Sequence, residues 1–165
     1  MACRGVLFSI TDDQSQKLRS AFGDDEAVLE IVQIEIEEAW DTAHLCETDK
    51  AWDAIHRCLG DGTINPNNGP LSFCILGGEH LHLGDTYIIS LLRPEQVKIL
   101  AAELKPLDRE WFRDKYFKID PSEYGFPGGL GEEDFEYTWY YFEEVRKFYE
   151  QAALESRWTF FSVDQ

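Results

Sequence analysis

Residues 132–165, EEDFEYTWYYFEEVRKFYEQAALESRWTFFSVDQ, combine a helix pattern and a strand pattern in one stretch. The first part is dense in aromatic residues and predicts a long helix from about 132 to 155. Trp158, Phe160 and Val163 then alternate with other residues, which predicts a closing strand. A long helix joined directly to a strand indicates that both kinds of element build the domain.

Working outward from this stretch, short apolar runs and helical periodicities fill the rest of the chain. Thr11 and Gln14 have the spacing of a capping box, which starts a helix after the first apolar run. In 25–36 a helical pattern gives way to alternation between 32 and 36, which predicts a helix followed by an extended piece. The other predicted strands are 5–10, 71–76 and 86–91, the other predicted helices are 49–59, 94–104 and 108–117, and the predicted loops are 61–70 and 121–131.

The length and composition bound the fold class. The chain has 165 residues, of which 44% are hydrophobic and 14% aromatic. That content argues against wholesale disorder and allows one core, and no internal repeat or linker divides the chain. We therefore expect an α+β fold in a single compact domain, 1–165, with a small mixed sheet packed with several helices, including the long aromatic-rich C-terminal helix.

The charge is strongly acidic and unevenly distributed. The formal net charge is −17; residues 24–49 hold ten acidic residues and residues 119–145 hold eight, both without Lys or Arg. Residues 93–118 instead hold seven basic and five acidic residues. Such a surface repels nucleic acid and anionic membranes, and it attracts basic proteins. The same charge also serves solubility alone, and the sequence does not show whether the two acidic segments meet in space.

The cysteines, the start of the chain and the absence of nucleotide motifs point to a cytoplasmic protein without a cofactor. The four cysteines form no C-x-x-C pair, which argues against a zinc knuckle or redox motif. The apolar run at the start is too short for a signal peptide, and no run approaches the ~20 apolar residues of a membrane span. No P-loop and no G-x-G-x-x-G is present. The oligomeric state is not determined by these features.

The helix 49–59 carries a candidate acid–base pair. Asp53 and His56 are three positions apart, so the carboxylate can orient the imidazole. No nucleophile motif accompanies them. The structural interpretation, which we favour, is that His56 is partly buried and bonded to a backbone carbonyl, with Asp53 helping to fix it.

A second candidate cluster follows Gly77 and Gly78 and suits a transition metal. The cluster consists of Glu79, His80, His82 and Asp85. In an extended segment His80 and His82 point to the same side, about 6.5–7 Å apart. Two imidazoles with a carboxylate suit zinc, iron or nickel, but the H-x-H pair needs a third ligand from elsewhere. Solvent-facing histidines after a turn are the favoured alternative, and no metal is expected. An enzyme hypothesis remains: a small hydrolase or metal-dependent enzyme centred on Asp53, His56, Glu79 and His80.

The preferred function class is an acidic protein-binding module. Tyr and Trp beside acidic residues supply contact area at modest entropy cost, and a basic partner such as a nuclease toxin would be attracted by the charge. An immunity or inhibitor protein is the narrower form of this hypothesis. The candidate binding residues are Glu35, Glu37, Glu38, Trp40, Trp52, Glu79, Glu133, Asp134, Tyr137 and Tyr141.

The stretches DKAWDAIHRCLGDG (49–62) and PLSFCILGG (70–78) resemble the YfbM-like family of uncharacterised bacterial proteins. The resemblance extends to GVLFSI, RPEQV and the aromatic helix, so it covers nearly the whole chain. It implies a compact α+β domain of bacterial origin and no established activity. Arg93 departs from the Thr-like cap that the family tends to place before the proline. The matching positions are Lys50, Trp52, His56, Pro70, Leu71, Gly77 and Gly78.

Overall fold

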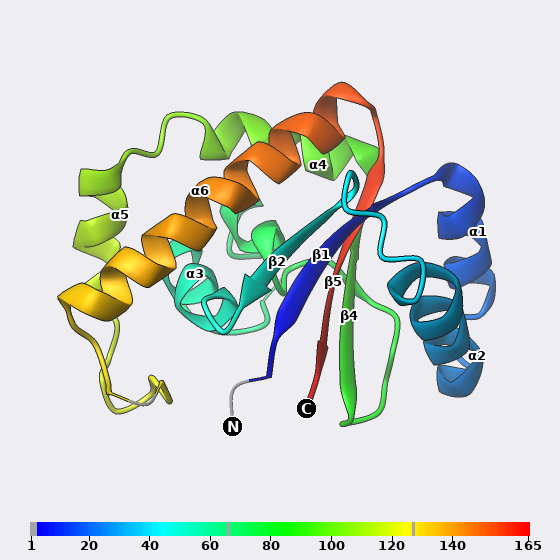
Figure 1. The fold of residues 1–165 in the computed structure, drawn as a ribbon, viewed down its shortest axis with the longest axis horizontal. Helices are drawn as coiled ribbons and strands as arrows, with labels where there is room; N and C mark the ends of the chain where they lie inside the picture. The colour runs from blue at the N-terminus through cyan, green and yellow to red at the C-terminus, as the bar shows by residue number, and fades with distance from the viewer. Residues whose placement is uncertain (1–2, 66, 127) are drawn as a thin grey trace.

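A five-stranded sheet forms the centre of the computed structural model, which describes residues 3–65, 67–126 and 128–165 (Figure 1). The strand order is β2-β1-β5-β4-β3. Every pairing is antiparallel, so the α+β class is confirmed but the expectation of a mixed sheet is corrected. The strands are β1 (Gly5–Ile10), β2 (Leu45–Asp49), β3 (Glu79–His80), β4 (Tyr87–Leu92) and β5 (Trp158–Asp164).

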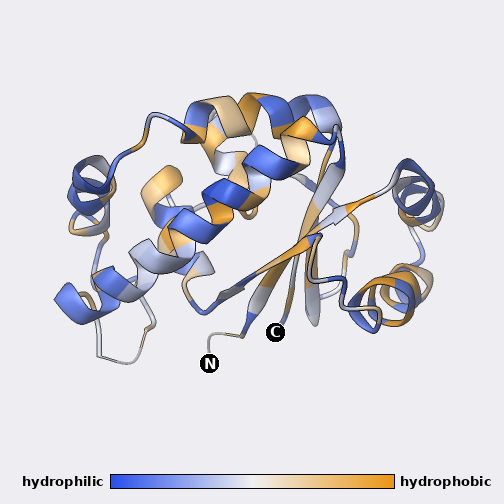
Figure 2. Cartoon of the chain, turned by 45° about the horizontal axis from the view of Figure 1, so that its top comes forward, coloured by the Kyte–Doolittle hydropathy of each residue, from blue (hydrophilic) through white to orange (hydrophobic). Residues whose placement is uncertain are grey.

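Helices cover both faces of this sheet, giving three layers in one domain. The helices on one face are α1 (Asp12–Ser20), α2 (Asp25–Glu30) and η1 (Ile31–Glu37), and those on the other are α3 (Trp52–Leu59), η2 (Pro70–Cys74), α4 (Pro94–Leu104), α5 (Arg109–Tyr116) and α6 (Glu132–Leu154). Figure 2 shows hydrophobic residues along the central strands and on parts of the helices on both sides. Among the described residues, no helix has both the length and the apolar character needed to span a bilayer.

Two hydrophobic cores lie on opposite faces of the sheet because neighbouring strand residues point in opposite directions. Leu7 and Phe161 belong to the larger core, beneath α3, α4, α5 and α6. Their neighbours Phe8 and Phe160 belong to the smaller core, beneath α1, α2 and η1. All four side chains are at most 3% exposed. The central strands therefore contribute apolar side chains to both faces.

The helix boundaries follow local hydrogen bonds that the sequence indicates. Gln14 N donates to Thr11 Oγ1 at 3.2 Å and Thr11 N donates to Gln14 Oε1 at 2.9 Å, which confirms the capping box. Asp24 starts α2 in a similar way, by accepting from Ala27 N at 3.1 Å. The predicted helices at 94–104, 108–117 and 132–155 are also present, with ends that differ by at most a residue.

Two segments predicted as extended are helical instead. The piece between 32 and 36 is part of the π-helix η1: Val32 and Ile36 are buried, but Ile34 is 55% exposed. Val32 and Ile36 are four residues apart and so lie on one face of a helix, which is why the alternation wrongly indicated a strand. The predicted strand 71–76 is largely the 3₁₀ helix η2, which begins at Pro70. Strand β2 was not predicted at all.

Candidate functional site

The positions shared with the YfbM-like family mainly support the fold. Trp52 Nε1 donates to Cys3 O at 2.8 Å, and its ring lies 5.6 Å from that of Phe161. A Cβ at Gly77 would collide with the backbone oxygen of Ser72. A Cβ at Gly78 would lie 2.5 Å from Leu91 O. These contacts explain the residue types without any catalytic role.

The candidate acid–base pair is not formed. Asp53 Oδ1 accepts from Arg57 Nε at 3.0 Å, and His56 Nε2 donates to Thr63 O at 3.0 Å. Burial lowers the pKa of His56, and its Nδ1 is buried without a hydrogen-bond partner. Burial therefore favours the neutral imidazole, and the bond to Thr63 O places a proton on Nε2. The backbone-carbonyl partner is the one that the structural interpretation expected, but Asp53 bonds to Arg57 instead of fixing the ring.

The two candidate histidine ligands of a metal are both bonded to backbone carbonyls. His80 Nε2 donates to Leu76 O at 2.7 Å, and His82 Nδ1 lies 2.9 Å from Tyr87 O. His82 is buried rather than solvent-facing, and Glu79 is exposed on β3. Within the described residues, no three His, Cys, Asp or Glu side chains are grouped so as to hold a metal ion.

The predicted acidic binding residues in η1 and at its C-terminal cap lie on the opposite face of the sheet from α6. Glu35 forms an ion pair with Lys17 at 2.8 Å. Glu37 Oε1 accepts from Tyr87 Oη at 2.6 Å and Ser162 Oγ at 3.1 Å, so it anchors η1 to the sheet. Glu38 is exposed. Since η1 and α6 lie on opposite faces of the sheet, these residues and the acidic residues of α6 form separate surfaces.

The acidic start of α6 is largely neutralised or buried. Arg113 Nη1 donates to Glu132 at 2.7 Å, and Arg109 forms a second two-point pair with Glu136. The basic segment 93–118 thus compensates part of the acidic segment that follows it. Glu133 is exposed beside these pairs.

Asp134 has a structural environment. It is 8% exposed, and its Oδ2 accepts from the hydroxyls of Tyr116 and Tyr124, the latter at 2.8 Å. Burial raises the pKa of both tyrosines, and the hydrogen bond to the Asp134 carboxylate raises it further. Asp134 therefore ties the loop before α6 to α5 instead of forming an exposed contact.

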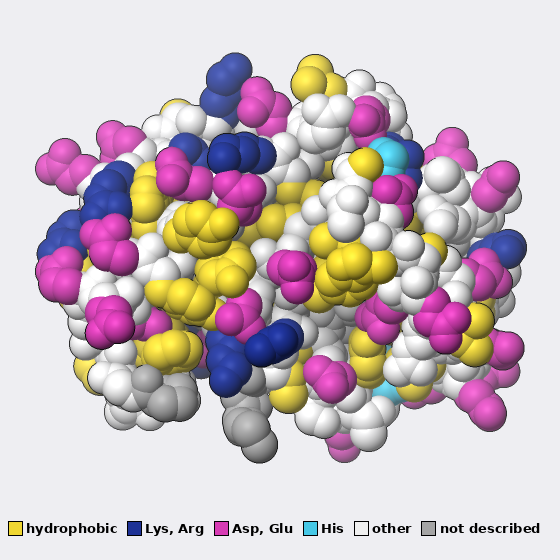
Figure 3. Space-filling view, viewed as in Figure 1, with side chains coloured by type: hydrophobic (Ala, Val, Ile, Leu, Met, Phe, Trp, Pro, Cys, Tyr) yellow, Lys and Arg dark blue, Asp and Glu magenta, His cyan; other side chains and the backbone are white. Residues whose placement is uncertain are grey.

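A groove of about 690 Å³ runs between β2 and α6. We call it the β2–α6 groove. Trp40 lies on one side of it and is 40% exposed; Tyr140, on α6, is 61% exposed. Figure 3 shows hydrophobic side chains over α6 and a second hydrophobic group to its right, with a hollow and acidic side chains between them. The residues that define the groove are Trp40, Leu45, Glu47, Tyr140, Tyr141 and Phe148.

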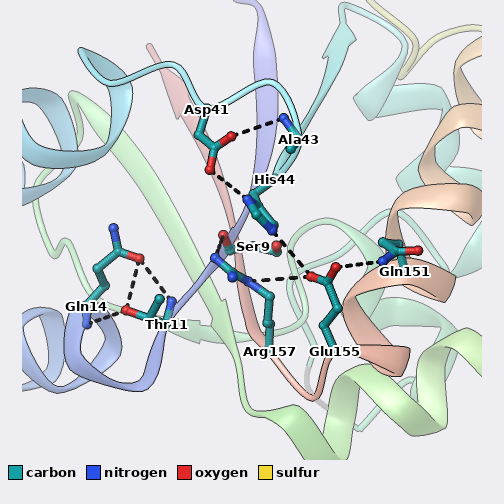
Figure 4. A network of polar contacts seen from close by, with 9 residues as sticks. All are labelled: Ser9, Thr11, Gln14, Asp41, Ala43, His44, Gln151, Glu155 and Arg157. Carbon is teal, nitrogen blue, oxygen red and sulfur yellow. Dashed lines mark hydrogen bonds and ion pairs between the residues drawn. The ribbon is translucent and has the colours of Figure 1, made fainter.

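A polar network fixes the loop that carries Trp40 (Figure 4). His44 Nδ1 lies 2.6 Å from Asp41 Oδ2, and His44 Nε2 lies 3.4 Å from Glu155 Oε2. The hydrogen bond with His44 lowers the pKa of Asp41. Arg157 Nη2 donates to Ser9 O at 3.1 Å beside this network. His44 thereby attaches the loop to the C-terminal end of α6, and its carbonyl accepts from Ser9 N of β1 at 2.8 Å.

Two residues near β2, one in the loop before it and one at its end, have unusual backbone geometry. Trp40 has φ 41° and Asp49 has φ 46°, in the left-handed region that non-glycine residues rarely adopt. Tyr137 Oη donates to Asp49 Oδ2 at 2.8 Å and accepts from Lys50 N at 3.2 Å. Such conformations cost free energy and concentrate at functional sites.

The groove unites two of the predicted binding residues, Trp40 and Tyr141. Trp52 lies instead in a separate hollow of about 410 Å³, and Tyr137 supports Asp49. Sequence reasoning missed Leu45 and Glu47 because it did not predict β2. The aromatic density of 132–155 did point to the α6 wall, although it did not distinguish exposed from buried rings.

Fold and site together define a three-layer α+β domain with an open groove rather than an enclosed pocket. The chain belongs to the family described as a domain of unknown function, DUF1877, whose model matches residues 1–161. Its fold is similar to that of YfbM from Escherichia coli, a protein of unknown function, with a TM-score of 0.70 and 17% identity over 97% of this chain and 99% of that one. Comparison with curated proteins gives no match.

Proposed function

We propose that this chain is an acidic protein-binding module that binds a basic protein through the β2–α6 groove. The observation that carries the proposal is the pair of aromatic walls, the exposed Trp40 on one side and the exposed Tyr140 with the half-buried Tyr141 on the other. Exposed Trp and Tyr are frequent centres of binding energy in protein interfaces. Trp40 also has a positive φ of 41°, and such backbone conformations concentrate at functional sites.

Charge supports a basic partner. The groove contains two internal ion pairs, Glu144 with Lys147 at 2.7 Å and Asp49 with Arg4 at 3.3 Å. Glu47 is exposed and has no ion pair among the described residues. The net charge of −17 adds a long-range attraction that raises association rates with basic proteins.

The narrower form of the proposal is an immunity or inhibitor protein for a nuclease-like toxin in the cytoplasm. A nuclease surface is positive where it binds phosphate, which fits an acidic inhibitor. The buried thiols of Cys46, Cys58 and Cys74 are unbridged, in keeping with a reducing compartment. Burial raises the pKa of Cys46 to about 12, so this thiol is unreactive.

The test is binding to a panel of purified basic nucleases by calorimetry, at about 0.05 M and about 0.5 M NaCl. We expect at least one nuclease to bind, more weakly at high salt, and to lose affinity when Tyr140 and Tyr141 are both changed to Ser. The matched control is Ile99→Ser, which alters a side chain that is 50% exposed on α4, outside the groove.

Two results would count against the proposal. One is that no nuclease binds at either salt concentration. The other is that the Tyr140→Ser/Tyr141→Ser and Ile99→Ser variants bind equally well, since the aromatic wall would then contribute nothing. Inhibition of the bound nuclease by the wild-type protein would support an immunity or inhibitor protein, and full nuclease activity in the complex would contradict it.

A further inference from the structure

Strand β2 has one free edge. It lies at the end of the sheet, where β1 is its only neighbouring strand among the described residues. Ser9 N donates to His44 O at 2.8 Å, and Phe8 and Leu7 pair with Leu45 and Cys46. Backbone groups alternate between the two edges of an antiparallel strand. The N–H groups of Leu45 and Glu47 therefore point away from β1.

The β2–α6 groove follows this free edge. Leu45 packs with the smaller core on one face of the sheet, whereas Cys46 belongs to the larger core on the other face. Both residues line the groove, together with Trp40 from the first side and Phe148 from α6. The hollow therefore lies beside the strand edge and touches both faces of β2. An added strand would occupy this position.

A second copy of this chain is a poor occupant. Glu47 is the middle residue of the five in β2. Two β2 strands paired antiparallel about their centre would place Glu47 opposite its own copy, and like charges directly opposite are destabilising. A Lys or Arg at that position would instead form a favourable cross-strand pair. The edge thus discriminates in favour of a basic segment.

We propose that an extended segment of a basic protein adds to β2 as a further strand, with Lys or Arg opposite Glu47 and an apolar side chain against Trp40. This inference rests on the proposed function and specifies its binding mode. Five residues of β2 span about 17 Å, which sets the length of the paired segment. Main-chain hydrogen bonds to Leu45 and Glu47 would supply affinity, and the two flanking side chains would supply selectivity.

The decisive variants are Glu47→Pro and Glu47→Gln. Both remove the carboxylate, but only proline also removes the outward N–H. Because that N–H does not bond to β1, proline is tolerated there as on other sheet edges. Circular dichroism and the thermal midpoint of each variant establish that the fold is intact.

The probe is a synthetic blocked nonapeptide of alternating Val and Thr with a central Lys, and its twin with a central Glu. We expect the wild-type protein to bind the Lys peptide more tightly than the Glu peptide. We also expect the Lys peptide to bind the Glu47→Gln variant about tenfold more tightly than the Glu47→Pro variant. In the isotope-labelled wild-type protein, saturation with the Lys peptide should slow amide exchange at Leu45 and Glu47 by about tenfold or more.

Strand addition would be overturned if the two variants bound the Lys peptide with equal affinity. It would also be overturned if amide exchange at Leu45 were unchanged at saturation, or if the wild type bound neither peptide. The wild-type exchange measurement stands even if Glu47→Pro fails to fold. A basic nuclease that binds both variants equally, while losing affinity for the tyrosine variants, would leave the proposed function intact and remove only this binding mode.

Discussion

Trp40 is the residue whose conformation is hardest to explain by stability alone. Its φ of 41° is unfavourable for a bulky side chain, and 40% of its surface is exposed. Its ring approaches that of Phe8 edge-on, with the ring centroids 6.0 Å apart. A strained position for a partly exposed aromatic side chain is the observation on which the proposed binding role of Trp40 rests.

We expect Trp40→Asn to weaken binding of a basic nuclease by about tenfold or more, as for other aromatic centres of interfaces. The lost contact with Phe8 should lower the free energy of unfolding by about 0.5–1.5 kcal/mol. Asn tolerates a positive φ, so relief of backbone strain should offset much of this loss. Calorimetry and urea unfolding measure the two effects. Phe22→Asn, at a side chain that is 51% exposed outside the groove, is the control. A loss of affinity no larger than that of Phe22→Asn would contradict this role.

His56 should make stability depend on pH. Burial lowers its pKa in the folded state from the ordinary value of 6.5. As the pH falls below 6.5, the unfolded chain takes up a proton that the folded protein does not, so the free energy of unfolding decreases until the folded-state pKa is reached. Urea unfolding at about pH 7 and about pH 5.5 should show this loss. The His56→Gln variant, whose side chain cannot titrate, should lose less unfolding free energy between the two pH values. If the variant loses as much as the wild type, His56 is not responsible.

At the level of elements, the turn from η2 to β3 depends on close backbone approach. Gly77 N donates to Ser72 O at 2.9 Å, and no side chain fits between the two residues. We expect Gly77→Ala to lower the free energy of unfolding by about 1–3 kcal/mol, because the backbone must shift to make room. Gly125→Ala is the matched control, since a Cβ there meets no atom within 4 Å. Urea unfolding of both variants makes the comparison, and equal stabilities would show that the turn can relax.

The elements with strong local signals could be predicted, and those defined by tertiary contacts could not. The capping box at Thr11 and the proline at 94 fix helix starts without help from the rest of the chain. By contrast, β2 is five residues long, lies at a sheet edge and includes charged residues, so its pattern is weak. The π-helix η1 arises from packing on the sheet, and its alternating apolar residues favoured a strand.

At the level of the whole molecule, the charge segregation seen in the sequence is partly cancelled by folding. Two arginines of α5 pair with two glutamates of α6, and η1 lies on the far face of the sheet. The candidate site was therefore only partly predictable. Trp40 and Tyr141 were predicted as binding residues from their types, but their meeting in one groove depends on the position of β2 between them.

The remaining negative charge should make stability rise with salt. Exposed ion pairs contribute little, whereas repulsion within a molecule of charge −17 acts over the whole surface at low ionic strength. We expect the thermal midpoint to increase between about 0.02 M and about 0.5 M NaCl. KCl at the same concentrations controls for ion identity. A midpoint that falls would mean that the ion pairs outweigh the repulsion.

The place of β5 in the sheet has a consequence for synthesis on the ribosome. It pairs with β1 on one side and β4 on the other, so the middle of the sheet is completed by a segment made after both of its neighbours. A nascent chain that has not yet produced residues 158–164 leaves β1 and β4 each with an open edge. Open edges recruit other strands, so a ribosome stalled before residue 158 should yield a chain that aggregates or is retained by chaperones.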